Sequence, residues 1–226
     1  LPWSKTKPPA HAKIAPMKKY LMEGIGAFFL TLAVVMMAPG NNGGMAPLVA
    51  GAMLLAMYYA GAHISGAHYN PAVSLAVLIR GKLDRVDFTY YWAAQFAGGG
   101  LGAMMAAFLL RCTGNGEIMV RGNDLACTLI AEFLGAFALT FTVLQVEYAR
   151  EHTGPGFGGV AAGFVFFAGM AIFGPISGGY LNPALALGAS VAGLIAWSDF
   201  PVYLIGSLLG AAAAVSLFRV INSEPA

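Results

Sequence analysis

Long apolar runs separated by short polar stretches dominate the hydrophobic pattern of this chain. Spanning the hydrocarbon core of a membrane takes about 20 consecutive apolar residues. Six runs reach that length and are predicted to be membrane-spanning helices: 18–38, 45–63, 88–111, 124–146, 156–175 and 199–221. Two shorter apolar runs remain, at 70–79 and 182–193. The pattern therefore predicts an all-α membrane protein with six spans and two shorter helices.

Each short run begins with a polar Asn-Pro pair, Asn70-Pro71 or Asn182-Pro183. Proline in the first turn of a helix loses no hydrogen bond and presets φ, so each pair is expected to start a helix. At about 1.5 Å per residue, roughly ten residues cover only half of a core about 30 Å thick. Each half-helix can therefore reach only the midplane of the membrane. Because non-helical backbone at this depth must be buried in protein or line water, the two Asn side chains are expected at a wet pore midpoint.

The two halves of the chain repeat each other. The stretch EGIGAFFLTL from Glu23 parallels EFLGAFALTF from Glu132, and the pattern ISG-x-x-x-NPA occurs at 64–72 and again at 176–184. Three spans per repeat give the two halves opposite orientations in the membrane. Inverted repeats whose broken helices meet at the midplane are typical of membrane transport proteins.

Composition supports the membrane assignment and adds a topology. Of 226 residues, 58% are hydrophobic and 10% are charged. A soluble globular protein of this size would have too few polar residues to cover its apolar ones. The net charge of +2 gives no reason to expect a nucleic-acid partner. With the N-terminus inside, only Arg111 and Arg121 lie outside, and the other basic residues face the cytoplasm: Lys5, Lys7, Lys13, Lys18, Lys19, Arg80, Lys82, Arg85, Arg150 and Arg219. This bias predicts both termini in the cytoplasm and a protein of the plasma or inner membrane.

The expected domain organisation is one membrane domain between two tails. Its predicted limits are a cytoplasmic tail at 1–17, a channel domain at 18–221 with repeats at about 18–111 and 124–221, and a tail at 222–226. Cys112 and Cys127 match no metal-ligand spacing. No combination of nucleophile, base and orienting residue and no cofactor motif is present, so no enzymatic activity, metal or cofactor is expected.

The residues around the Asn-Pro pairs resemble a known family. Two Asn-Pro-Ala boxes, Asn70-Pro71-Ala72 and Asn182-Pro183-Ala184, occur in inverted repeats with SGAHYNPAV, YYWAAQFAGG and a repeated membrane Glu around them. In these features the chain resembles the aquaporin and glycerol-facilitator superfamily from about residue 18 to residue 221. The resemblance implies an aquaporin-like fold of six tilted helices and two half-helices in the lipid bilayer. It also implies a pore through each subunit and a homotetramer.

Elementary electrostatics indicates how such a pore would select. The positive ends of both half-helix dipoles face the midpoint and repel cations. A water molecule there offers its oxygen to both Asn amides, which breaks the hydrogen-bonded chain that protons need. The chain is therefore expected to conduct water and small neutral solutes passively and to exclude ions.

Two acidic residues, Glu23 and Glu132, lie well inside predicted spans. Carboxylates within a membrane are functional candidates by default, and a proton-coupled carrier could use them as a relay. The resemblance instead implies a structural role, in which each carboxylate accepts hydrogen bonds from the loop before a half-helix. His68, two residues before the first box, is expected to anchor its loop near the pore.

One departure from the family pattern concerns selectivity. The resemblance implies an outer constriction of four residues, usually including an Arg directly after the second box, and here that residue is Leu185. The other three positions correspond to Ala50, Met170 and Gly179. None of the four is charged or aromatic. Two alternatives follow: a wide, apolar opening that admits larger neutral solutes, or a hydrophobic contact between Met170 and Leu185 that closes the pore by dewetting.

The leading hypothesis is therefore a passive channel for water and small neutral solutes with an apolar outer constriction that has no Arg. The first alternative is a facilitator tuned to a larger neutral solute such as glycerol, urea or an uncharged metalloid hydroxide. A proton-coupled carrier and a non-conducting structural membrane protein are the other hypotheses.

Overall fold

The computed structural model describes residues 16–37, 44–112, 124–149 and 156–222, and in these ranges it is helical without strands. The eight helices are α1 (Pro16–Met36), α2 (Ala46–Ser65), α3 (Pro71–Ile79), α4 (Arg85–Cys112), α5 (Leu125–Tyr148), α6 (Gly158–Ser177), α7 (Pro183–Val191) and α8 (Phe200–Ile221). Six of them are long and apolar enough to cross a membrane. The predicted all-α class, the six spans and the two half-helices are thereby confirmed, with ends that differ by at most three residues.

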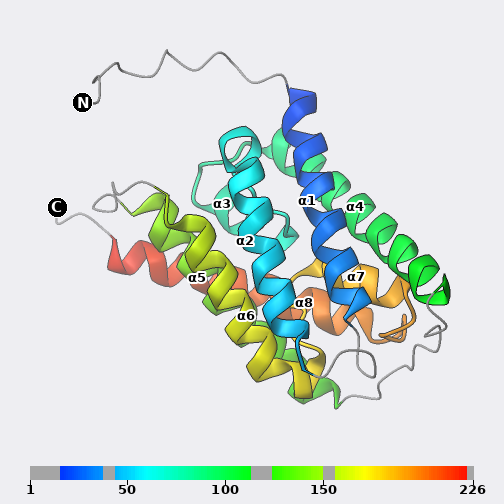
Figure 1. Cartoon of the computed structure of the whole chain (residues 1–226). Helices are drawn as coiled ribbons and strands as arrows, with labels where there is room; N and C mark the ends of the chain where they lie inside the picture. The colour runs from blue at the N-terminus through cyan, green and yellow to red at the C-terminus, as the bar shows by residue number, and fades with distance from the viewer. Residues whose placement is uncertain (1–15, 38–43, 113–123, 150–155, 223–226) are drawn as a thin grey trace, which may run out of the picture.

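The two repeats pack in the same way. Within repeat one α1 lies along α4, and within repeat two α5 lies along α8, while α2 packs on α6 and joins the halves. Figure 1 shows α1 and α4 side by side, with α5 and α6 on the other side of the bundle. The spans alternate in direction. We call the end where α1 begins and α2 ends the inner end, and the opposite end the outer end.

Glycines at matching positions bring the paired helices into close contact. A Cβ on Gly98 of α4 would collide with the Gly24 carbonyl oxygen of α1, and a Cβ on Gly210 of α8 would collide with the Phe133 carbonyl oxygen of α5. Small residues at such crossings let backbones approach and gain van der Waals contact, which stabilises helix pairs in a membrane.

The half-helices begin as the sequence predicts. Asn70 and Asn182 are extended N-cap residues, and their side-chain oxygens accept hydrogen bonds from the N–H groups of Ala72 at 2.8 Å and Ala184 at 2.9 Å. Each cap satisfies a donor that the first helical turn leaves free. Each half-helix also packs across the repeat boundary, α3 on α8 and α7 on α4. The two halves are therefore interlocked rather than simply placed side by side.

Parts of the predicted organisation fall outside the described residues. Arg121 and nearly all of both predicted tails are among them. The outer start of α5 is described: the Asp124 carboxylate accepts a hydrogen bond from the Cys127 backbone N–H at 2.8 Å. This bond lowers the pKa of the Asp124 carboxyl from its usual value, because it stabilises the charged form.

Candidate functional site

Two loops lead into the half-helices and share an uncommon backbone. After the left-handed C-caps Gly66 and Gly178, the non-glycine residues Ala67, Tyr69 and Leu181 adopt φ values of 52°, 49° and 53°. Such conformations cost on the order of 1–3 kcal/mol each and persist only where the surroundings fix them. The loops therefore need strong local partners.

Glu23 provides those partners in the first repeat. Its Oε1 accepts hydrogen bonds from Ser65 Oγ at 2.6 Å and from the His68 N–H at 3.0 Å. Its Oε2 accepts from the Tyr69 N–H at 2.6 Å and from Gln95 Nε2 at 2.8 Å. The side chain is fully buried. A buried carboxylate with four donors is well compensated, and it fixes the first loop from α1.

Glu132 does the same in the second repeat. Its Oε1 accepts hydrogen bonds from Ser177 Oγ at 2.7 Å and from the Tyr180 N–H at 3.0 Å, and its Oε2 accepts from the Leu181 N–H at 2.6 Å. This side chain is also fully buried. The geometry favours the expected loop-anchoring role over a proton relay, because both oxygens of each carboxylate already accept bonds.

The two Asn side chains are linked across the repeats. Asn70 Nδ2 donates to the Leu181 carbonyl and Asn182 Nδ2 donates to the Tyr69 carbonyl, each at 3.0 Å. An amide nitrogen carries two N–H groups, so each side chain keeps a second donor for another acceptor. The left-handed residues Tyr69 and Leu181 turn their carbonyls toward the opposite Asn, which explains why both loops retain this conformation.

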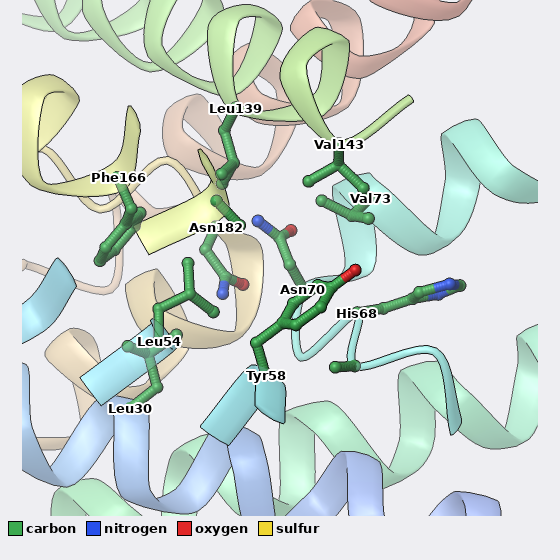
Figure 2. A pocket seen from close by; sticks show the side chains of 12 residues that line it. Leu30, Leu54, Tyr58, His68, Asn70, Val73, Leu139, Val143, Phe166 and Asn182 are labelled. Carbon is green, nitrogen blue, oxygen red and sulfur yellow. The ribbon is translucent and has the colours of Figure 1, made fainter. Parts of the chain in front are cut away.

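A narrow cavity begins at this pair and runs toward the inner end. Figure 2 shows Asn70 and Asn182 facing it together with Leu54, Phe166 and Val143. Its volume is about 10 Å³, which corresponds to the space of a single water molecule. The full lining is Leu30, Leu54, Tyr58, Ala67, His68, Asn70, Val73, Leu139, Val143, Ala162, Phe166 and Asn182.

His68 lies where the narrow cavity meets a wider recess of about 260 Å³ at the inner end. Its Nδ1 is 3.0 Å from Ser74 Oγ, and its ring lies edge-on to Tyr91 at 5.4 Å between centroids. Figure 2 shows the ring directed away from the two Asn side chains. These contacts hold the ring between Ser74 of α3 and Tyr91 of α4.

The four residues expected at the outer constriction are buried. Ala50, Met170 and Leu185 are 0%, 6% and 1% exposed and share one hydrophobic cluster. A Cβ on Gly179 would lie 2.9 Å from Cα of Met170, so these two positions are in contact. The Met170 and Leu185 side chains therefore pack among apolar neighbours. The wide opening and the hydrophobic contact between Met170 and Leu185 both stay predictions.

Several functional contacts escaped the sequence analysis. Gln95 was recognised only as part of a family-like stretch, yet it contacts both Glu23 and Ser74. Its amide in an apolar span was the available signal, since buried polar groups need partners. Tyr58, which lines the cavity, carried no signal apart from its hydroxyl in an apolar run. In the described ranges no three His, Cys, Asp or Glu side chains lie together as a metal site would require.

Comparison with known proteins gives consistent matches. The model of the family described as "Major intrinsic protein" matches residues 10–218. A "Probable aquaporin TIP-type alpha" of Phaseolus vulgaris is 34% identical over 184 residues, covering 76% of this chain and 68% of the relative. "Aquaporin AqpM" of Methanothermobacter thermautotrophicus is 29% identical over 246 residues, covering 92% and 98%. The solved aquaglyceroporin from Plasmodium falciparum superposes with a TM-score of 0.78 at 20% identity, covering 92% and 97%.

Proposed function

Because the chain belongs to the major intrinsic protein family, a family of integral membrane channels, we propose that it conducts water and small neutral solutes through the passage between Asn70 and Asn182. Conduction is passive in this proposal, with no coupled ion. The proposal also includes a homotetramer in the plasma or inner membrane, with both termini in the cytoplasm.

The reciprocal hydrogen bonds of the two Asn side chains carry this proposal. Each bond to the opposite loop fixes one N–H and leaves the second N–H of the same amide for a passing oxygen. The N-termini of α3 and α7 meet at this point, so their dipoles add positive potential there. Both features favour a neutral molecule that offers a lone pair, and both disfavour a cation.

The hydrogen-bonding state of Glu23 and Glu132 argues against proton coupling. Each carboxylate accepts two backbone N–H bonds from its loop. Protonation would break these bonds and release the loop that presents the opposite carbonyl to Asn70 or Asn182. A relay that disrupts its own pore in every cycle is a poor carrier, so both residues are assigned to loop anchoring.

The apolar outer constriction favours one finer assignment. Ala50, Met170, Gly179 and Leu185 offer no side-chain donor to replace the hydration of a polar solute, so passage there depends on size and on the movement of Met170. Methionine has three rotatable side-chain bonds and readily changes shape. We therefore propose water as the main permeant, and a larger neutral solute such as glycerol as the second candidate, admitted when Met170 moves aside.

Stopped-flow light scattering of proteoliposomes tests the proposal. Native protein, Met170→Ala and Leu185→Arg are compared under sucrose, glycerol and urea gradients. We expect fast water efflux in native vesicles, faster glycerol entry with Met170→Ala, and suppressed glycerol entry with surviving water flow in Leu185→Arg. A fourth protein, Leu185→Gly, is measured in the same gradients. If the native protein shows no flow and Leu185→Gly restores it, the native pore is closed by a hydrophobic gate and the proposal of an open channel is wrong. No flow of any solute in any variant would refute the channel.

A further inference from the structure

The inner end of the narrow cavity differs in chemistry from the outer constriction. There the lining comes from three spans, with Tyr58 of α2, Val143 of α5 and Ala162 of α6. Figure 2 shows the Tyr58 ring beside Asn70, with its hydroxyl directed toward the side of Val143 and Val73. A polar aromatic side chain therefore occupies the inner half of the passage, whereas the outer constriction is wholly aliphatic.

The hydroxyl of Tyr58 has a partner beyond the cavity. Tyr58 is only 6% exposed and makes a side-chain hydrogen bond with Glu147, an exposed residue near the end of α5. Glu147 lies four residues after Val143, so the two side chains share one face of α5, with Glu147 closer to the inner end. The hydrogen bond therefore links α2 to α5 on the inner side of Val143.

The first turn of α6 leaves room for this bridge. A Cβ on Gly158 would collide with Tyr58 Oη and with Glu147 Oε1. A Cβ on Gly159 would lie 3.0 Å from Cδ1 of Tyr58. The next residue of α2, Tyr59, points to the outside and donates to the Gly156 carbonyl at 2.5 Å, which ties the inner end of α2 to the start of α6. The absence of side chains at Gly158 and Gly159 leaves room for the Tyr58 ring, and the bond of Tyr59 to Gly156 fixes the start of α6 beside it.

We infer that Tyr58, held by Glu147, forms a second constriction at the inner end of the channel and is a specificity-determining residue for solute size. This inference rests on the proposed function, since only a conducting passage can be constricted. A solute that passes between Asn70 and Asn182 must next pass the Tyr58 ring. The ring can move only when its hydrogen bond to Glu147 and its contact with α6 are released.

Packing alone does not account for these observations. A tyrosine that only fills the core needs no partner on a separate span, and a phenylalanine would fill the same volume. Here the hydroxyl of a cavity-lining ring binds a carboxylate on another span that is itself exposed. The same bond orients the ring and holds it in the passage.

The test measures glycerol and water permeability of proteoliposomes that carry native protein, Tyr58→Ala, Tyr58→Phe, Glu147→Ala or Glu147→Gln. Tyr58→Ala removes the ring and is expected to raise glycerol permeability about tenfold with a smaller rise for water. Tyr58→Phe removes only the hydroxyl, and Glu147→Ala removes its partner while the Tyr58 ring stays, so a rise in glycerol permeability of up to about fivefold is expected for both. Glu147→Gln keeps an acceptor and should behave like the native protein. Gly100→Ala is a matched control, because open space surrounds that position.

The outcomes separate this inference from the proposed function. Unchanged glycerol-to-water ratios in Tyr58→Ala, Tyr58→Phe and Glu147→Ala, with native protein that conducts, would overturn the inference and leave the channel intact. Absence of conduction in the native protein and in every variant, Leu185→Gly included, refutes the channel itself. Because Tyr58→Ala could fail to fold, the two variants that retain the bulk of the site carry the decision. Similar changes in Tyr58→Phe and Glu147→Ala, with no additive effect in the double variant, would establish that the residues act as one unit.

Discussion

The first loop, 66–69, and the second loop, 178–181, are held by the same kinds of contact but lie in different surroundings. At each loop the preceding Ser and two backbone N–H groups of the loop bind a buried Glu, and a left-handed residue offers its carbonyl to the opposite Asn. In both, a Tyr hydroxyl of the next long helix donates to the Ser carbonyl, at 2.7 Å in the first repeat and 2.9 Å in the second. The contacts that position the two Asn side chains are therefore common to both repeats.

The surroundings of the two loops differ. Gln95 donates to both Glu23 and Ser74, and His68 joins Ser74, so the first loop sits in a polar network. The corresponding residues of the second repeat are Ser207, Ala186 and Tyr180. Ser207 donates to the Tyr203 carbonyl of its own helix instead of reaching Glu132. The second loop therefore depends on fewer polar contacts, and it lies beside the apolar constriction.

This difference separates two functions of the fold. Hydrogen bonds that place the Asn donors and the half-helix dipoles are duplicated, because losing either set would disorganise the midpoint of the passage. Residues proposed to meet the solute on either side of that midpoint are not duplicated between the repeats, so the two halves of the proposed passage have unlike linings.

The largest expected effect comes from replacing the anchoring carboxylates by amides. Glu132→Gln places an NH₂ group against the Leu181 N–H and leaves both without an acceptor, which should cost about 3–5 kcal/mol of unfolding free energy. Glu23→Gln should cost about 1–2 kcal/mol less, because Gln95 can turn its Oε1, now buried without a partner, toward the new NH₂. SDS titration of the purified protein, followed by circular dichroism, measures both losses.

Gly100→Ala provides the control for this pair, and its higher helix propensity should raise the unfolding free energy by at most about 1 kcal/mol. Equal losses for Glu23→Gln and Glu132→Gln would contradict the assigned role of Gln95. If Gln95 has the assigned role, the double variant Glu23→Gln with Gln95→Leu should be as unstable as Glu132→Gln, because the compensating amide is gone.

The shared contacts should respond equally to substitution. Asn70→Ala and Asn182→Ala each remove an N-cap and one bond to the opposite loop, so each should lose about 2 kcal/mol of unfolding free energy. The same titration measures this effect. A difference between the two variants larger than about 1 kcal/mol, which is the net value of one hydrogen bond, would show that the reciprocal bonds are not equivalent.

The smallest expected effects are those of the residues that differ between repeats. Gln95→Leu should cost about 1–2 kcal/mol, because Glu23 loses a charge-assisted bond but keeps its backbone donors. Ser207→Ala should cost at most about 0.5 kcal/mol, since its hydroxyl binds only a carbonyl that the helix already uses. Thermal unfolding in detergent ranks the two variants, and a larger loss for Ser207→Ala would contradict the comparison.

Local signals in the sequence were sufficient for much of this architecture. Apolar length predicted the six spans, and Asn70-Pro71 and Asn182-Pro183 predicted the starts of the half-helices, because capping and the geometry of proline act within a single turn. The repeated Glu23 and Glu132 could be matched to their loops through the internal repeat and the family resemblance.

Contacts between distant segments could not be predicted. Gln95 lies 72 residues from Glu23, and Tyr58 meets Glu147 from another repeat, so both contacts depend on how spans rotate and cross. The width of the proposed outer constriction depends on the rotamers of Met170 and Leu185, and side-chain rotamers cannot be read from a sequence pattern. Periodicity places a residue on a helix, but packing between helices determines what it touches.

The most direct test of passive conduction is a paired measurement of water and proton fluxes in the same proteoliposomes. Native protein should accelerate shrinkage under sucrose equally at acidic and neutral pH, with proton influx no faster than in protein-free vesicles. Water efflux that is no faster than in protein-free vesicles, or solute entry that follows an imposed proton gradient, would contradict the account.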